Sequence, residues 1–191
     1  MSFDRRVRRK PKTPSLKILS DGQLNRLLAL LEKDPRLSDV HDVVVIVADT
    51  GLRAGELMNL RWADIDTSRR KLTISSNTFY LRVVSFADAT LRVFEARRQH
   101  QPESEFVLGV SPRKAIERAS HRLAALSASV GMKNVSLHSL RLTCLARLFM
   151  SGVSPSSIRL ITGLRSTAQL MYQRSMRTLP LVHGRTRLRS N

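Results

Sequence analysis

The amino-acid sequence predicts a mainly α-helical domain with one small antiparallel β-sheet, that is, an α+β fold. Three observations predict it. Most apolar residues recur at the three-to-four-residue spacing of amphipathic helices. Only two short segments, "KLTIS" and "YLRVVSF", have the β-branched and aromatic enrichment of strands, and they lie close together. The chain of 191 residues is 42% hydrophobic, which suits one domain with a substantial core.

Three helices are expected before the sheet: Gly22–Glu32, Asp39–Thr50 and Ala54–Leu60. Ser20 is a suitable N-cap for the first, whose apolar face carries Leu24, Leu27, Leu28 and Leu31. A loop containing Pro35 separates the first helix from the second, which is apolar enough to be buried. Gly51 then interrupts the chain. The two strand-like segments follow, and the short linker "SNTF" between them favours a β-hairpin.

Four more helices are expected after the sheet: Ala87–Gln99, Pro112–Val130, a helix from about His138 to Gly152, and a short helix in "SPSSIRLITG". Gly131 is a natural stop for the second of these. Ser154 can cap the short helix, and Pro155 suits its first position. The domain is therefore expected to span residues 15–176, with a basic tail over residues 177–191.

Residues 1–14 hold six basic residues and two prolines, and they are expected to form a flexible basic arm. Two interpretations of this arm are open. It is either a solubilising tail or an arm that contacts DNA through Arg5, Arg6, Arg8, Arg9 and Lys10.

The net charge of the chain is +18, which is too large for an ordinary solvated surface and indicates a polyanionic partner. Nucleic acid is the first expectation, and a ribosomal-type or membrane-surface protein is the alternative. The single cysteine, Cys144, excludes an intrachain disulfide, argues against a zinc site and fits a reducing cytosol. The longest apolar run, Val43–Ala48, is too short to span a bilayer, and no secretory signal is expected.

The tetrapeptide "TGLR" occurs twice, in "DTGLRAGELMNLRWADID" from Asp49 and in "ITGLRSTAQLMYQRS" from Ile161. A repeat can indicate a duplicated structural unit. Coincidence and two parts of one site are the other interpretations. The second copy precedes Tyr172, and a tyrosine there is either a packing residue or a nucleophile.

Two pairs of residues suggest chemistry besides this tyrosine. Arg53 and Glu56 share a helix face, as do His138 and Arg141, because each pair is three residues apart. A guanidinium matches phosphate oxygens with a rigid fork of donors, and a histidine can donate a hydrogen bond or move a proton. An ion pair at a helix start and a solvated basic face are the alternatives. A tyrosine nucleophile would need nearby arginines, since the pKa of a free tyrosine is about 10.

Taken in this order, the segments resemble the motifs of the tyrosine recombinase family, the lambda-integrase-like enzymes that include phage integrases and Xer recombinases. The first motif is "TGLRAGEL" followed by "LRWADID", which places Trp62 and Arg53 in it. The second is "HSLR", with His138 and Arg141. The third runs from Gly163 to Tyr172. The resemblance covers about residues 15–175.

The resemblance implies the fold of a tyrosine recombinase catalytic domain and the roles of four residues. Arg53 and Arg141 would clamp the scissile phosphate, and His138 would assist proton transfer. Tyr172 would attack, leaving a 3′-phosphotyrosyl link and a free 5′-hydroxyl. Because this link keeps the bond energy, the resemblance implies no metal and no cofactor.

The implied partner is double-stranded DNA, and the implied location is the cytoplasm, at the nucleoid. The DNA would be recombined or integrated, as in phages and other mobile elements. Basic residues on the predicted helix Pro112–Val130 are further candidates for DNA contacts, namely Arg113, Lys114 and Arg118.

Two positions depart from the family pattern. The family has a lysine on the hairpin as general acid, and the matching position here is at or near Asn77. The nearest candidates to replace it are Lys71 and Arg82, although an arginine is a poor proton donor. The family has a histidine or tryptophan after the glycine of the third motif. Here Leu164 stands there, with Arg165 next to it as the candidate replacement, and loss of one general acid lowers a rate by about 10²–10⁴-fold.

The first hypothesis is therefore a DNA strand-exchange enzyme, and the second is a recombinase-derived DNA-binding protein that does not complete the reaction. The third is an unrelated basic helical protein that binds DNA or RNA. The chain begins near the start of the catalytic domain, so no N-terminal core-binding domain is expected. The segment "LPLVHG" is expected to dock on a neighbouring protomer and give a homo-oligomer on DNA.

Overall fold

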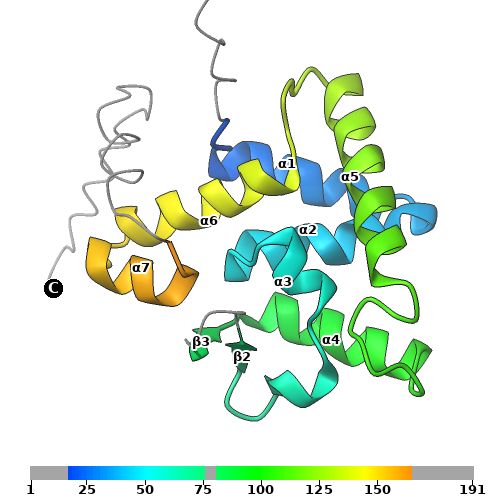
Figure 1. The fold of residues 1–191 in the computed structure, drawn as a ribbon. Helices are drawn as coiled ribbons and strands as arrows, with labels where there is room; N and C mark the ends of the chain where they lie inside the picture. The colour runs from blue at the N-terminus through cyan, green and yellow to red at the C-terminus, as the bar shows by residue number, and fades with distance from the viewer. Residues whose placement is uncertain (1–16, 76–80, 165–191) are drawn as a thin grey trace, which may run out of the picture.

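The computed structural model describes residues 17–75 and 81–164, and the structural statements below refer to these residues (Figure 1). Their helices are α1 (Asp21–Glu32), α2 (Ser38–Thr50), α3 (Ala54–Met58), α4 (Asp88–His100), α5 (Pro112–Ser129), α6 (Leu137–Met150) and α7 (Pro155–Thr162). Two 3₁₀ turns are η1 (Pro35–Leu37) and η2 (Trp62–Asp64). The strands are β1 (Ile65–Asp66), β2 (Lys71–Ser75) and β3 (Leu81–Ser85). The predicted α+β fold class is confirmed.

Helix α2 forms the centre of the fold, and α1, α4, α5 and α6 pack around it (Figure 1). Its sequence is apolar on nearly all sides, so that a helix here is stable only when neighbours cover it. Val44, Ile46 and Val47 are completely buried. Each such side chain stabilises the fold by about 1.5–3 kcal/mol. The prediction of a buried helix is confirmed, and its first residue lies one position earlier than expected.

The small sheet has the order β1-β2-β3, and both strand pairs are antiparallel. The predicted hairpin is confirmed by the pairing of β2 with β3, while the linker "SNTF" lies outside the described residues. Strand β1 was not expected, because two residues are too few to show an alternating pattern. Strand β3 lies against α7, which brings Arg82 beside the end of that helix.

The helix ends follow from local capping. The Ser20 side chain accepts from the Gln23 backbone N–H at 3.2 Å, and Gln23 Oε1 accepts from the Ser20 N–H at 3.1 Å. Both predicted caps, Ser20 and Ser154, are confirmed. The loop expected around Pro35 is instead the turn η1. Helix α3 ends before Leu60, because the Leu60 carbonyl leaves the helix to accept from the Val107 N–H at 3.0 Å.

A separate apolar cluster fixes α7 to α6. Leu142 and Leu145 from α6 and Ile158 from α7 are buried together, and Leu164 packs against them. Figure 1 shows the two helices side by side. The C-terminal end of α7 is therefore held in place by side-chain packing. None of the helices that the structure describes is both long and apolar enough to cross a membrane.

Candidate active site

The two copies of "TGLR" end two helices in the same way. Thr50 ends α2 and Thr162 ends α7, and each threonine Oγ1 donates to the carbonyl four residues earlier at 2.5 Å. The glycines that follow, Gly51 and Gly163, have φ values of 65° and 64°. This left-handed conformation suits glycine and ends a helix. The repeat is thus a repeated helix ending at two separate places in the chain.

Three arginines converge on the C-terminal end of α7, where they donate to the carbonyl oxygens of three successive residues, 161–163. Arg82 Nε reaches the first carbonyl at 2.8 Å, and Arg141 Nη2 reaches the second at 2.8 Å. Arg53 Nη2 donates to the third. The unpaired carbonyls at the end of a helix carry partial negative charge, so they attract cations. These three residues, Arg53, Arg82 and Arg141, are called the arginine cluster below.

Arg141 joins the two copies of "TGLR". Its Nη1 donates to the Gly51 carbonyl, and its Nη2 donates to the Thr162 carbonyl. Arg141 as a whole residue is only 5% exposed. Burial, together with the neighbouring charge of Arg53, lowers the pKa of Arg141 to about 10, so the group remains charged at neutral pH. A buried cation beside a second cation is a site where a bound anion is strongly favoured.

Glu56 lies between two members of the arginine cluster. Its carboxylate accepts from the backbone N–H and Nη1 of Arg53, each at 2.7 Å. It also accepts from Nη1 and Nη2 of Arg82, at 2.8 and 2.7 Å. Burial raises the pKa of Glu56, but the hydrogen bonds from Arg82 and Arg53 more than offset this, and the net pKa lies below its usual value. The ion pair between Arg53 and Glu56, which the sequence offers as an alternative interpretation of this pair, is present.

We predict that the stabilisation from Glu56 is lost in acid. A carboxyl group whose pKa is lowered by folding stabilises the folded state. This stabilisation is fully present above the pKa of the unfolded state, 4.5, and disappears as the pH falls through the lower pKa of the folded state. The melting temperatures of the wild type and Glu56→Gln should therefore differ by a constant amount above about pH 4.5 and converge below it.

The matched control is Glu117→Gln on α5. This glutamate forms an exposed pair with Arg113 at 2.9 Å, and its removal should change the melting temperature little at any pH. A wild-type advantage over Glu56→Gln that persists undiminished to pH 3 would contradict the assignment.

The arginine cluster lines an open groove of about 1470 Å³ between the hairpin, α3 and the ends of α6 and α7. His138 is exposed on the first turn of α6 and lines the same groove. The structure therefore brings together three of the four residues predicted to be catalytic, Arg53, His138 and Arg141. Tyr172 lies outside the described residues.

The candidate replacements for the two missing groups are placed differently. Lys71 is exposed at the start of β2, opposite Ser85, and does not line the groove, whose nearest residue on this strand is Thr73, about 7 Å further along. Arg82 lines the groove, but Glu56 and the end of α7 take up its guanidinium. Leu164 lines the groove too. Arg165 and the basic arm, with Arg5, Arg6, Arg8, Arg9 and Lys10, lie outside the described residues.

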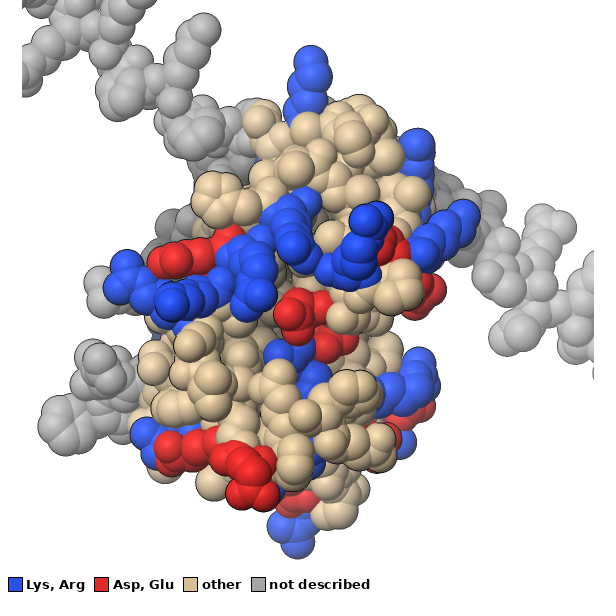
Figure 2. Space-filling view, turned by 90° about the vertical axis from the view of Figure 1, so that its right-hand side faces the viewer, with Lys and Arg blue, Asp and Glu red and all other residues tan. Residues whose placement is uncertain are grey.

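The three basic residues expected on α5 lie apart from the groove. Arg113, Lys114 and Arg118 are all exposed, and none of them lines it. Figure 2 shows the side of the molecule on which α5 lies. Lys and Arg side chains form a band across this face, interrupted by carboxylates. This face can therefore attract a polyanion.

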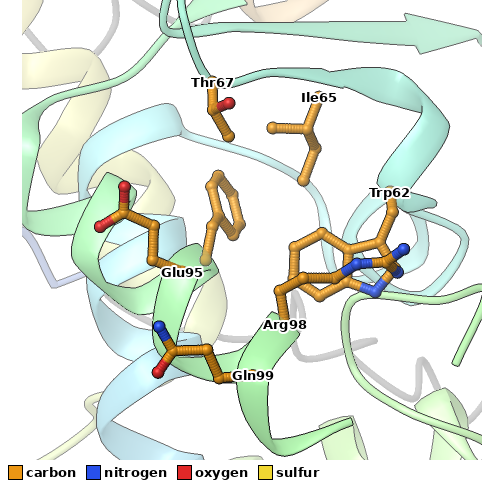
Figure 3. Close-up of a pocket in the computed structure, with 7 residues that line it drawn as sticks. Trp62, Ile65, Thr67, Glu95, Arg98 and Gln99 are labelled. Atoms are coloured by element: carbon orange, nitrogen blue, oxygen red, sulfur yellow. The ribbon is translucent and has the colours of Figure 1, made fainter. Parts of the chain in front are cut away.

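A second cavity, of about 450 Å³, lies between η2 and α4 (Figure 3). The Arg98 guanidinium lies over the Trp62 ring, 5.3 Å from its centroid, and Trp62 meets Phe94 edge to face at 6.2 Å. No residue lines both this cavity and the groove. Trp62, the tryptophan of the first motif, is thus a packing residue that anchors η2 to α4.

Cys144 is a buried packing residue beside the site. Its Sγ donates to the Asp49 carbonyl at 3.2 Å, and burial raises its pKa to about 11. Such a thiol is protonated and unreactive at neutral pH. Within residues 17–75 and 81–164, no three His, Cys, Asp or Glu side chains are grouped to hold a metal ion.

The sequence did not reveal two features of the site. The pairing of Arg82 with Glu56 was not expected, because the two residues are 26 positions apart and share no motif. The role of the carbonyls at 161–163 was not expected either, because backbone carbonyls carry no sequence signature. The only available signal was the second copy of "TGLR", which marks the end of α7.

Residues 17–177 match the phage integrase family. No match was found among curated protein sequences. Among solved structures, an integrase of the Tn1549 transposon in complex with a circular intermediate DNA is similar, with a TM-score of 0.73 and 18% identity over 84% of this chain and 62% of that chain. XerA recombinase gives a TM-score of 0.67 and 24% identity over 84% and 63% of the two chains.

A lambda integrase dimer bound to a COC′ core site is also similar, with a TM-score of 0.60 and 16% identity over 80% of this chain and 59% of that chain. At these identities the likeness concerns the fold. This chain spans about three fifths of the length of each of the three structures.

Proposed function

Because this chain belongs to the phage integrase family, we propose that it forms the catalytic domain of a tyrosine recombinase, which cuts and rejoins DNA through a 3′-phosphotyrosyl intermediate. One observation carries the proposal. Arg53 of the first motif and His138 and Arg141 of the second line one groove. Such a groove offers donors on more than one side of a bound phosphate.

The charge of the groove supports phosphoryl transfer. The three guanidinium groups of the arginine cluster are partly neutralised by one carboxylate, that of Glu56, so two positive charges remain. A phosphodiester carries one negative charge, and the five-coordinate transition state of its displacement carries nearly two. Preorganised cations stabilise such a transition state more than the ground state, which is the requirement for catalysis.

The proposed reaction needs no water and no cofactor in its cleavage step. The Tyr172 hydroxyl attacks phosphorus, the bond from phosphorus to the tyrosine oxygen forms, and the bond to the 5′-oxygen breaks. The tyrosine gives up one proton, and the 5′-oxygen takes up one on leaving. His138, at the groove, is the proposed carrier for this proton, and Arg53 and Arg141 are the proposed clamp. Rejoining is the reverse reaction with another 5′-hydroxyl.

Double-stranded DNA is the proposed partner, and the cytoplasmic nucleoid is the proposed location. The net charge of +18 supports this, because phosphate contacts by Lys and Arg dominate the affinity of proteins for DNA. Under the same proposal, the basic residues of segment 1–14 and of α5 contact the DNA backbone outside the groove. We further propose that the segment Leu179–Val182 docks on a neighbouring protomer on DNA.

The test is the capture of a covalent protein–DNA adduct. A library of duplexes with a random core and a nick near the core is incubated with the protein, and the DNA that survives denaturation on the protein is sequenced. The nick lets the cleaved fragment diffuse away, so an adduct accumulates. We expect enrichment of one sequence with the wild type and no adduct with Tyr172→Phe, which keeps the ring and removes the nucleophile. Crosslinking of the same complexes reports the number of protomers.

The second candidate function, DNA binding without strand exchange, makes a different prediction for the same library. It is favoured by Leu164, which stands where the family has a hydrogen-bond donor. DNA retained in a salt-sensitive manner by both the wild type and Tyr172→Phe, with no adduct from either, would favour this second function.

A further inference from the structure

Arg82 is the member of the arginine cluster that the family resemblance offered only as a candidate replacement for the hairpin lysine. Its side chain is 9% exposed, against 42% for Arg53. Both terminal nitrogens of its guanidinium pair with the two oxygens of Glu56, and Nε donates to the Ile161 carbonyl. A bidentate pair of this kind is the strongest and most directional contact between an arginine and a carboxylate. Arg82 therefore connects β3, α3 and α7.

The Glu56 carboxylate is saturated by these contacts. It accepts two hydrogen bonds from Arg53 and two from Arg82, which is about the number that its lone pairs allow. Without Arg82, two lone pairs of the Glu56 carboxylate would have no hydrogen-bond donor, although this side chain is only 11% exposed. Glu56 would then no longer be held in place, and Arg53, which is bound to it, would lose its fixed orientation toward the groove.

The balance of charges also indicates that Arg82 keeps Arg53 available to the groove. Arg53 and Glu56 alone would form a neutral pair, and a neutral pair attracts a phosphate weakly. Arg82 supplies a second cation to the same carboxylate, so the three groups together keep one positive charge. The exposed member of the three is Arg53, and this charge is therefore presented on the groove side.

We propose that Arg82 is a positioning residue for the reaction: it holds Glu56 so that Glu56 orients Arg53 toward the scissile phosphate without neutralising it. This proposal rests on the proposed function of the groove. Arg82 itself acts without touching DNA, because its donor groups are turned to Glu56 and to the end of α7.

The test compares Arg82→Gln and Arg82→Lys on the DNA selected with the wild type. We expect Arg82→Gln to slow adduct formation at saturating DNA by about 100-fold, the typical effect of a misplaced catalytic group. The rate should fall far more than the affinity for DNA, because many phosphate contacts outside the groove contribute to binding, whereas Arg53 acts at the scissile phosphate alone. The rate of adduct formation by Arg82→Lys should lie between the rates of the wild type and of Arg82→Gln, because an ammonium cannot span both carboxylate oxygens.

A double-mutant cycle with Glu56→Gln separates action through Glu56 from action elsewhere. If Arg82 acts through Glu56, the double variant should react about as fast as the slower single variant, since the two changes remove one connected unit. Additive losses would overturn the proposal. The matched control is Arg36→Gln, because Arg36 forms a bidentate pair with Asp34, at 2.9 and 3.0 Å, that is exposed and distant from the groove. Its adduct rate should equal that of the wild type.

A measurement that does not depend on catalytic activity distinguishes a failure of the positioning role of Arg82 from a failure of the proposed function. The Nε–H of Arg53 can be followed by ¹⁵N relaxation, and Arg82→Gln should make it markedly more mobile, whereas Arg36→Gln should not. An equally ordered Arg53 in Arg82→Gln would overturn the positioning role even if the wild type forms no adduct. If the wild type forms no adduct but Arg53 is more mobile in Arg82→Gln, only the proposed function would be overturned.

Discussion

Replacement of Arg141 by glutamine is expected to slow covalent adduct formation by about 10³-fold or more, the effect of removing a preorganised charge from a phosphoryl-transfer site. Arg141 is the buried cation of the cluster, and its position is fixed by carbonyls from both helix endings, at Gly51 and Thr162. Glutamine can still donate to one of these carbonyls, but it carries no charge to the phosphate.

The loss of rate must be separated from a loss of stability. Arg141→Gln leaves one buried carbonyl unpaired, which costs about 1–3 kcal/mol, but it also removes a charge whose burial is unfavourable. The single-turnover rate should therefore be measured at a temperature where the melting curve shows the variant fully folded. Arg141→Lys should be nearly as slow, because an ammonium group cannot reproduce the planar fork that spans the two carbonyls.

Arg147→Gln is the matched control on the same helix. Arg147 is exposed and lies 3.4 Å from Asp21 across the surface, so its removal should change neither stability nor rate by much. A folded Arg141→Gln variant that reacts within about tenfold of the wild type would mean that Arg141 is not part of the clamp.

The helices of this fold could be predicted because the residues that specify each helix lie within or next to it in the sequence. The apolar run of α2, the caps Ser20 and Ser154 and the proline at the start of α5 all act within a few residues of themselves. Strand β1 and turn η1 could not be predicted in this way, because segments of two or three residues carry no period. Their existence depends on partners elsewhere, such as Leu72 opposite Ile65.

The same distinction between local and long-range information applies to the candidate site. Arg53 with Glu56, and His138 with Arg141, could be predicted to project together, since the members of each pair are three residues apart at the start of a helix. The meeting of these pairs at the end of α7 depends on contacts across as many as 110 positions, from Arg53 to Gly163. Such contacts follow from the packing of α6 and α7, and the sequence alone showed only that "TGLR" occurs twice.

The second expected result with a large effect concerns this second copy, at Gly163. In Gly163→Ala, the added Cβ would lie 3.2 Å from Arg53 Nη1 and 3.4 Å from Arg82 Nη1. The φ value of 64° also strains an alanine by about 1–2 kcal/mol. We expect the variant to lose stability and, in addition, to form the adduct about 100-fold more slowly, because two arginines of the cluster must move.

Gly131→Ala is the control that isolates the second effect. Gly131 has a φ value of 77°, but no atom lies within 4 Å of where its Cβ would be. The two variants should therefore lose similar stability, as measured by urea denaturation, and only Gly163→Ala should lose rate. Equal rates for the two would show that the end of α7 does not hold the arginines in their reactive positions. A rate loss confined to Gly163→Ala would mean that the backbone of the second "TGLR" acts on phosphate through the arginine cluster, as the first copy does directly through Arg53.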